Sequence, residues 1–405
     1  MNYLSYLECS KCGKKFETDK IQTFCPECEA TLLARYELDK IRDDMDKGDF
    51  YCRQPDMWRY WELLPVDSRS KVVSLGEGFT PIHELKDLSE ELGIEELLMK
   101  DESFIPTGSF KARGLAMAVS RANELGVSSV AMPSAGNAAG ALSTYGALAD
   151  MDVNVVMPAD APESCKLECF MTGADIYLVD GLISDAGRII GQGVDKYGWF
   201  DVSTMKEPYR LEGKKTMGLE IAEQLGWILP DMILYPTGGG TGIIGMWKAF
   251  KELKELGWVD GEMPKMVVVQ SEGCAPVVDA YHEGKRETSP WEGAETMAGG
   301  IRVPQSFADH LILDLLYESD GFAVKVSDGS IKEAAKRLGN GGFFICPEGA
   351  ATLAGLEKLV EEGKLGEEKE VLLYNTGAGM KYTSAYMKEL DVDIPVVSSI
   401  EDLEA

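Results

Sequence analysis

The residue in the most distinctive chemical setting is Lys111, within KDESFIPTGSFKARG at residues 100–114. An apolar run is followed by a polar turn, and a helical pattern then begins at Lys111 and continues to Glu124. A lysine at such a strand-to-helix elbow projects its amine into the cleft at a strand end, as a lysine that forms a Schiff base requires. By itself a lysine in the first turn of a helix is more often a solvated surface residue, so the flanking segments must decide.

The segment MPSAGNAAG, residues 132–140, is a second candidate for ligand binding. It follows the apolar run SSVAM and opens a helix of small residues, so the backbone N–H groups after Ser134 lie at the positive end of the helix dipole. This arrangement favours binding of a carboxylate, and the Asn137 side chain can reach a ring hydroxyl. The alternative is that Ser134 and Asn137 only cap the helix.

The segment YPTGGGTGIIG, residues 235–245, predicts a phosphate site. Three successive glycines, Gly238, Gly239 and Gly240, let the backbone wrap closely around an anion, and Thr241 adds a hydroxyl donor. The segment lacks the spacing and the lysine of a nucleotide P-loop, and it does not fit the dinucleotide pattern GxGxxG, so we expect neither ligand. Close packing of the backbone is the alternative reason for the glycines.

The segment VLLYNTGAGMKY, residues 371–382, predicts a strand that ends in a polar turn. The hydroxyl of Thr376 in this turn can hydrogen-bond a pyridine nitrogen without protonating it. Compared with a carboxylate partner, a hydroxyl weakens the ring as an electron sink and so favours elimination and replacement over transamination.

Two CxxC pairs lie near the N-terminus, in ECSKCGKKF and FCPECEA. The thiolates of Cys9, Cys12, Cys25 and Cys28 can complete a tetrahedral site, and structural zinc is the metal expected there. Iron and a degenerate, metal-free knuckle remain the alternatives. The other cysteines are scattered along the chain, which is typical of free thiols in a reducing compartment.

From about residue 70 onward, short apolar runs, glycine-bearing turns and amphipathic helical patterns alternate. This alternation predicts parallel strands joined by right-handed crossovers, and therefore an α/β fold with open parallel sheets. Because ligands bind at the carboxyl ends of such strands, we expect the four segments above to meet there. The 405 residues leave room for two core domains and a small appendage.

The charge balance limits the partners of the chain. It has 40 Lys and Arg against 68 Asp and Glu, a formal net charge of −28. Such a surface repels phosphate backbones and anionic membranes, so we expect neither nucleic acid nor a membrane as partner. The sequence has no run of roughly 20 apolar residues and no signal-peptide pattern, so we expect a cytoplasmic protein.

Taken in their order along the chain, these segments resemble the threonine synthase family, within fold type II of the pyridoxal 5′-phosphate (PLP) enzymes. The resemblance covers nearly the whole chain and includes the CxxC pairs, EGFTP at 77–81, PTGSFKARG, PSAGN, EPYRLEGKKT at 207–216, TGGGTG, PEGAA at 347–351 and NTGAGMKY. It implies a fold like that of the tryptophan synthase β chain, with two open parallel-sheet α/β domains and a small N-terminal zinc ribbon. We assign residues 1–35 to the ribbon, 36–110 and 215–405 to the larger, PLP-binding domain, and 111–214 to the smaller domain.

The resemblance implies that PLP is the cofactor and that Lys111 forms the internal aldimine with it. It further implies that Asn137 contacts the 3′ oxygen of PLP and that Thr376 contacts its ring nitrogen. The residues that would hold the PLP phosphate are Gly238, Gly239, Gly240 and Thr241.

The same resemblance implies a small, phosphorylated amino-acid substrate and a homodimer. Ser134 and the turn after it would hold the substrate carboxylate, while Arg210, together with Lys215, would meet the substrate phosphate, for which a guanidinium fork is well shaped. In the family's reaction the substrate amine displaces Lys111, which then removes the α-proton. Loss of a β-proton, expulsion of phosphate from Cγ and addition of water at Cβ convert O-phosphohomoserine to threonine.

Three positions depart from the family's usual pattern. Ala112 stands where many members have aspartate, Glu207 where asparagine is common, and Lys214 where glutamine is common. An acidic side chain beside a phosphate pocket is unfavourable unless the extra lysine neutralises it. The alternatives are therefore a β-replacement on O-phosphoserine, as in cysteate synthase, or dehydration of threonine or serine. A catalytically dead zinc-ribbon interaction protein is an alternative from another class, and the intact lysine and glycine segments argue against it.

Overall fold

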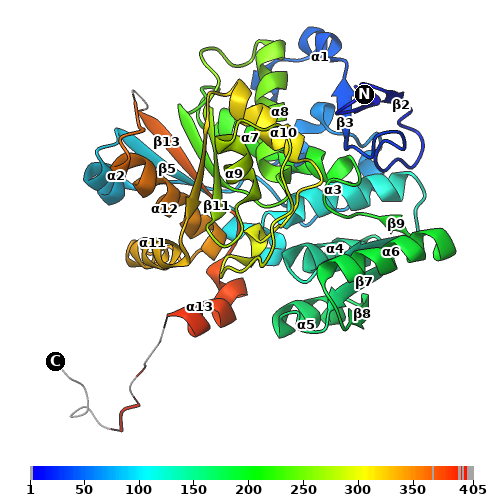
Figure 1. The fold of residues 1–405 in the computed structure, drawn as a ribbon. Helices are drawn as coiled ribbons and strands as arrows, with labels where there is room; N and C mark the ends of the chain where they lie inside the picture. The colour runs from blue at the N-terminus through cyan, green and yellow to red at the C-terminus, as the bar shows by residue number, and fades with distance from the viewer. Residues whose placement is uncertain (1–2, 367–368, 391–393, 395, 399–405) are drawn as a thin grey trace.

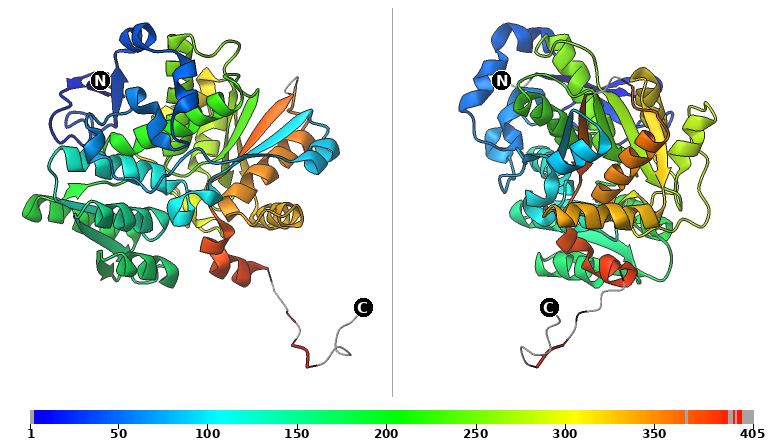
Figure 2. Two further views of the ribbon diagram at one scale, coloured as in Figure 1. Left: turned by 180° about the vertical axis from the view of Figure 1, so that it is seen from behind. Right: turned by 90° about the vertical axis from the view of Figure 1, so that its left-hand side faces the viewer.

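The computed structural model describes residues 3–366, 369–390, 394 and 396–398 and contains three β-sheets. In Figure 1 the N-terminal sheet lies at the upper right, the largest sheet at the left and centre, and the third at the lower right; Figure 2 shows the same arrangement from behind and from the side. Within the described ranges, no helix has both the length and the apolar composition that a membrane span needs.

The largest sheet has six strands in the order β12-β11-β10-β13-β5-β4, all parallel to their neighbours except the edge strand β4. Its strands are β4 Ile82–Glu84, β5 Glu96–Asp101, β10 Met232–Pro236, β11 Lys265–Ser271, β12 Phe322–Val326 and β13 Glu370–Asn375. Its helices are α2 Lys86–Leu92, α7 Tyr209–Gln224, α8 Thr241–Leu256, α9 Pro276–His282, α10 Asp309–Glu318, α11 Asp328–Asn340, α12 Pro347–Glu361 and α13 Thr383–Glu389.

Apolar residues cover both faces of this sheet, as a parallel sheet requires. Alternate strand residues such as Ile233 and Val268 pack with α7, α8, α9 and α10 on one face. Their neighbours Leu234 and Val267 point the other way and pack with α11 and α12 on the opposite face. The layered α/β fold predicted from the sequence is confirmed.

The second α/β sheet has four parallel strands in the order β8-β7-β6-β9. Its strands are β6 Ser129–Pro133, β7 Asp152–Pro158, β8 Asp175–Val179 and β9 Phe200–Asp201, and its helices are α3 Lys111–Glu124, α4 Asn137–Leu148, α5 Glu163–Met171 and α6 Ile183–Tyr197. The N-terminal ribbon has the antiparallel strands β1 Leu4–Cys9, β2 Lys15–Phe16 and β3 Leu32–Tyr36, followed by α1 Leu38–Asp44.

The strands of the two large sheets come from the segments that the sequence assigned to the larger and the smaller domain. The assigned boundary at residue 214 falls inside α7, which continues from Tyr209 to Gln224 without a break. Because a domain boundary belongs in a connecting loop and not within one hydrogen-bonded helix, we move it to the loop before Tyr209. The division of the chain into these domains stays a prediction.

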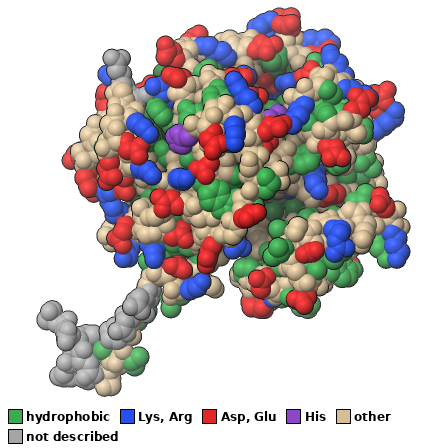
Figure 3. Space-filling view, viewed as in Figure 1, with side chains coloured by type: hydrophobic (Ala, Val, Ile, Leu, Met, Phe, Trp, Pro, Cys, Tyr) green, Lys and Arg blue, Asp and Glu red, His purple; other side chains and the backbone are tan. Residues whose placement is uncertain are grey.

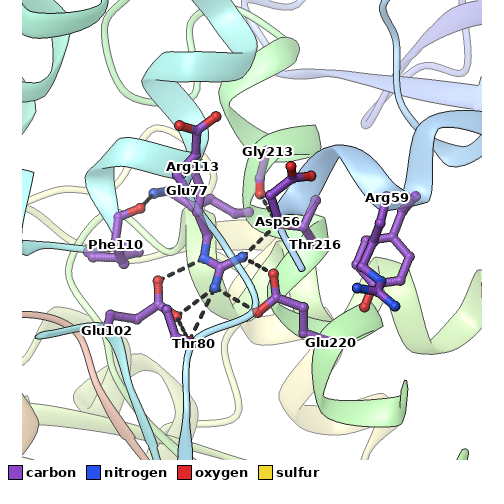
Figure 4. A network of polar contacts seen from close by, with 12 residues as sticks. Asp56, Arg59, Glu77, Thr80, Glu102, Phe110, Arg113, Gly213, Thr216 and Glu220 are labelled. Atoms are coloured by element: carbon purple, nitrogen blue, oxygen red, sulfur yellow. Dashed lines mark hydrogen bonds and ion pairs between the residues drawn. The ribbon is translucent and has the colours of Figure 1, made fainter. Parts of the chain in front are cut away.

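Arg113 holds the start of α3 against the larger sheet. Its guanidinium lies between Glu102, which follows β5, and Glu220 of α7, as Figure 4 shows. Arg113 is two residues after Lys111, so this buried contact fixes the helical turn that carries the lysine. The predicted helix from Lys111 to Glu124 is confirmed.

Candidate active site

Lys111 stands at the elbow that the sequence predicted, half-buried at the first residue of α3. Its ammonium lies 4.4 Å from the ring centroid of Phe110, and among the described residues no hydrogen bond holds it. Burial and, second, the charge of Arg210 lower the pKa of Lys111 to about 8, and Glu348 opposes this shift. A substantial share of the amine is therefore neutral near pH 8, as a nucleophile or a base requires.

Lys214 lies beside Lys111. Its amine donates a hydrogen bond to the Phe110 carbonyl oxygen and lies 4.0 Å from the centroid of the same Phe110 ring. The side chain is fully buried, and its pKa is well below the ordinary value because of burial first and the charges of Lys111 and Arg210 second. Two amines therefore share one side of the cleft.

Arg210 supplies the third cation. It is buried, its Nη1 donates to the Val202 carbonyl oxygen at 2.7 Å, and its Nε has no hydrogen-bond partner. Burial lowers the pKa of Arg210, whereas the neighbouring Glu207 and Asp201 raise it. The guanidinium is thus placed to meet an anion that enters the cleft.

Glu207 lies one residue before Pro208, the N-cap of α7, and its side chain binds the first backbone N–H groups of the helix. Its carboxylate accepts hydrogen bonds from the backbone N–H groups of Tyr209 at 2.7 Å and Arg210 at 2.9 Å. Burial raises its pKa to about 7. An acidic residue is tolerated beside the cationic cluster because it binds the positive end of the helix and is partly protonated at neutral pH.

The structure does not bring Lys215 to this cluster. The Lys215 amine makes ion pairs with Glu212 at 2.7 Å and Glu252 at 2.9 Å, and it lies over the ring of Tyr36. Consecutive residues of an α-helix point about 100° apart, so Lys214 and Lys215 face different surroundings. Lys214 takes the place beside Arg210 that the sequence analysis gave to Lys215.

The glycine segment forms the turn between β10 and α8, and α8 begins at Thr241. A Cβ atom would lie 2.9 Å from the Gly300 carbonyl oxygen at Gly238 and 2.8 Å from Thr204 Cγ2 at Gly239. Gly240 has φ +80°, a backbone conformation that favours glycine. The turn therefore presents bare backbone at the positive end of a 16-residue helix, which suits a phosphate.

Thr376 follows β13 and lies next to the Lys111 elbow. Its carbonyl oxygen accepts a hydrogen bond from the Phe110 backbone N–H at 2.9 Å, and its hydroxyl is 3.4 Å from the Cys346 sulfur. Burial raises the pKa of the Cys346 thiol, so this sulfur is a neutral neighbour. Thr376 thus offers a hydroxyl, and no charge, at this end of the cleft.

Asn137 begins α4 and bridges to the opposite wall, because its Nδ2 donates to the Tyr382 hydroxyl at 2.9 Å. Ser134, in the turn before α4, accepts a hydrogen bond of 3.4 Å from the Gly136 backbone N–H. The turn after β6 is half-buried, so its N–H groups can face a bound carboxylate.

Two residues of this region escaped the sequence reasoning, Glu348 and Tyr382. Glu348 Oε1 accepts a hydrogen bond from the Gly300 backbone N–H at 2.5 Å, its Oε2 has no partner, and burial raises its pKa. The segments PEGAA and NTGAGMKY contain both residues, which is the signal that was available. Nothing in a sequence distinguishes a buried glutamate whose pKa is raised from a glutamate on the surface.

Several buried polar atoms around the cleft lack hydrogen-bond partners. Besides Arg210 Nε and Glu348 Oε2 they include Thr107 Oγ1, Ser109 Oγ and Tyr235 Oη. Buried polar groups are almost always paired in folded proteins, so a ligand with several polar atoms would complete the hydrogen bonding of this group. The surface is hollowed between the part at the lower right, which contains the smaller α/β sheet, and the rest of the molecule (Figure 3).

The four N-terminal cysteines also come together. The sulfur of Cys9 is 3.2 Å from that of Cys28, Cys12 is 3.8 Å from Cys25, and all four sulfurs lie within 4.8 Å of one another. Four thiolates around one zinc ion are about 3.8 Å apart, given a Zn–S bond of about 2.3 Å. The arrangement is a candidate metal centre.

Known proteins resemble the chain along most of its length. A family model described as "Pyridoxal-phosphate dependent enzyme" matches residues 73–377. The threonine synthase of Methanocaldococcus jannaschii is 37% identical over 390 residues, which is 96% of each chain. That of Methanosarcina acetivorans is also 37% identical, over 93% of this chain and 92% of the relative.

Solved structures give the same fold. Maize serine racemase superposes with a TM-score of 0.65 at 24% identity, covering 77% of this chain and 92% of the other. Threonine deaminase from Solanum lycopersicum superposes with a TM-score of 0.64 at 24% identity, covering 76% of this chain and 82% of the other. These likenesses confirm the fold class predicted from the sequence.

Proposed function

We propose that this chain, which belongs to the threonine synthase family of pyridoxal-phosphate dependent enzymes, converts O-phosphohomoserine and water to threonine and phosphate. It is a PLP-dependent lyase. The observation that carries the proposed substrate is the cluster of Lys111, Lys214 and Arg210. In the described part of the chain, these three basic side chains have no carboxylate partner at ion-pair distance. The glycine turn can hold a second phosphate.

The residues present fit PLP. The glycine turn 238–240 and Thr241 would hold its phosphate, Asn137 its 3′ oxygen and Thr376 its ring nitrogen, while Lys111 would form the covalent link. The unpartnered hydroxyls around the cleft support this assignment, because a cofactor with many polar atoms would satisfy them. When bound, PLP withdraws electrons from the amino acid attached to it.

The protein's own residues supply binding and proton transfer. The backbone N–H groups after Ser134 would hold the substrate carboxylate, and Arg210 with Lys214 would hold its phosphate. Once released from the cofactor, the Lys111 amine, whose pKa is about 8, can take the α-proton and return it at a later step. Arg210 and Lys214 would also stabilise the phosphate as it leaves with the bonding electrons.

We further propose that the four-cysteine centre binds structural zinc, with iron and a metal-free ribbon as the alternatives. A ribbon this small has little core of its own, so the metal would supply much of its folding energy. Metal analysis of the purified protein distinguishes the three cases. Zinc in a 1:1 ratio supports the proposal, whereas iron or no metal contradicts it.

We propose the cytoplasm as the compartment and a homodimer as the assembly. None of the nine cysteines, all of which the structure describes, forms a disulfide, which is compatible with a reducing compartment. Light scattering coupled to gel filtration tests the assembly, and a monomer mass would contradict it.

The decisive experiment is an absorbance spectrum of the purified protein, repeated after addition of O-phosphohomoserine while phosphate and threonine are measured together. Equal release of both products supports the proposal. A cofactor band that changes without threonine formation would redirect the assignment to O-phosphoserine with sulfite, or to dehydration of threonine or serine. Absence of any cofactor band would contradict the enzyme itself.

A further inference from the structure

We infer that Thr31 of the N-terminal ribbon is a positioning residue for substrate binding, acting through the backbone of residues 201–208. This inference rests on the proposed function, because these residues precede α7 and its Arg210. The Thr31 hydroxyl donates a hydrogen bond to the Met205 carbonyl oxygen at 2.9 Å, and both residues are buried. The ribbon thus contacts the backbone next to the cationic cluster directly.

The Met205 backbone needs such a support. Its φ is +64°, in the left-handed region that residues other than glycine rarely adopt. Such a conformation is unfavourable and persists only where the surroundings hold it. The Thr31 hydrogen bond is one of the contacts that hold it.

The other side of the 201–208 segment lies against the predicted phosphate turn. Thr204 is exposed toward solvent, and its Cγ2 occupies the space next to Gly239, where a Cβ would lie 2.8 Å away. The Val202 carbonyl accepts from Arg210 Nη1 at 2.7 Å. Moving the Met205 carbonyl would therefore displace both a wall of the glycine turn and the acceptor that orients Arg210.

The ribbon is itself attached to α7 and α8 by contacts of Tyr36. The Tyr36 hydroxyl at the end of β3 donates to Glu212 at 2.8 Å, and the amines of Lys215 and Lys248 lie 3.9 Å and 5.0 Å from its ring centroid. The paired cluster around Lys215 therefore anchors the ribbon to α7 and α8. Because the ribbon is fixed in this way, the hydrogen bond from Thr31 holds the Met205 carbonyl, and with it the segment before α7, in place.

Thr31→Val tests the inference, because valine keeps the shape of threonine and removes the donor. We expect the KM for O-phosphohomoserine to rise about tenfold while kcat changes less than about twofold, because the buried Met205 carbonyl loses its donor and the segment that orients Arg210 is then less firmly held. The cofactor band and the metal content should not change. Thr31→Ser, which keeps the hydroxyl, should restore the KM of the wild type.

Hydrogen–deuterium exchange of peptides covering residues 201–208 gives a readout that does not depend on the substrate. The Lys206 N–H, which donates to the Ser203 carbonyl at 3.2 Å, should exchange faster in Thr31→Val than in the wild type. Lys11→Met is the matched control, because it removes a ribbon-to-body ion pair with Glu287 and leaves Thr31 in place. It should change neither the exchange nor the KM.

Each outcome separates the inference from the proposed function. Unchanged exchange in Thr31→Val, or the same effects in Lys11→Met, would overturn the role of Thr31. A wild type that forms no threonine would overturn the proposed function, while faster exchange in Thr31→Val would still support the contact between the ribbon and the 201–208 segment. If Thr31→Val does not fold, Thr31→Ala replaces it. A KM and an exchange rate like those of the wild type would then overturn the positioning role of Thr31, whereas a higher KM together with faster exchange would support it.

Discussion

Two buried groups of ionisable side chains include residues of α3 and α7, and they differ in the number of acidic partners that their basic side chains have. The first pairs Lys100 and Arg113 with Glu102 and Glu220, and all four side chains are fully buried. Arg113 Nε is 2.7 Å from Glu102 and its Nη1 is 2.5 Å from Glu220; Figure 4 shows Arg113 between these two carboxylates. Lys100 is 3.0 Å from Glu220. Two cations meet two carboxylates, so the group is complete in itself.

The second group, Lys111, Lys214 and Arg210, is not complete. Within the ranges that the structure describes, none of the three makes an ion pair, and burial raises the pKa of the nearby Glu207 and Glu348. Three basic groups without a carboxylate partner are thus buried together in a chain whose net charge is −28. Burying unpaired charge is costly. The first group contains its own carboxylates and contributes to the fold, whereas the second group has none and is placed to bind an anion from outside the protein.

Lys111→Ala removes the amine on which the proposed site depends and is the strongest test of the second group. We expect the cofactor band to change and threonine formation to fall by at least about a thousandfold, because covalent attachment and general base catalysis are lost together. Thermal stability should change little, since no hydrogen bond to this amine is seen among the described residues. Activity near that of the wild type would contradict the assignment of Lys111.

Arg113→Met should instead destabilise the protein, because it leaves Glu102 and Glu220 with Lys100 as their only cation. Removing one partner of a buried pair costs about 3–5 kcal/mol. Thermal unfolding followed by calorimetry measures the loss. The double variant Arg113→Met with Glu102→Gln restores equal numbers of charges and should recover part of it, and a double variant as unstable as the sum of the single ones would refute the idea of balance.

The sequence indicated much of this site because the relevant residues stand at the ends of strands. The predicted helix start at Lys111, the turn before Asn137, the glycine turn before Thr241 and the strand that ends before Thr376 all have the expected elements in the structure. Apolar runs and glycine-bearing turns report directly on the backbone. The location of a strand end therefore follows from local pattern.

Side-chain direction within a buried helix did not follow from pattern. Residues 209–223 of α7 are all buried, so no polar face distinguishes Lys214 from Lys215. The direction of each lysine side chain depends on its partners. Glu212 and Glu252 pair with Lys215, whereas Lys214 donates a hydrogen bond to the Phe110 carbonyl. Those partners are up to about a hundred residues away in the chain, beyond what periodicity can report.

Glu207 should make the stability of the protein depend on pH in the neutral range. Burial raises its pKa from 4.5 to about 7, so the folded protein binds this proton more tightly than the unfolded chain does. The resulting stabilisation is full below pH 4.5 and is lost as the pH rises through 7. Between pH 5 and pH 8 the wild type should therefore lose up to about 2.5 kcal/mol relative to Glu207→Gln, which cannot ionise. Denaturant unfolding of both proteins at several pH values measures the difference, and parallel curves would contradict the shifted pKa.

Lys214→Gln and Lys215→Gln form a matched pair of substitutions at adjacent residues. Lys214 belongs to the group without carboxylate partners, whereas Lys215 is paired with Glu212 and Glu252. Lys214→Gln should raise the KM for O-phosphohomoserine about tenfold, the effect of one lost charge-assisted hydrogen bond, without lowering stability, because it relieves repulsion from Lys111 and Arg210. Lys215→Gln should lower stability and leave the KM unchanged, because it deprives Glu212 and Glu252 of a partner. If the effects were exchanged between the two variants, Lys215 would be the phosphate ligand after all, and the excess charge around Lys111 would need another explanation.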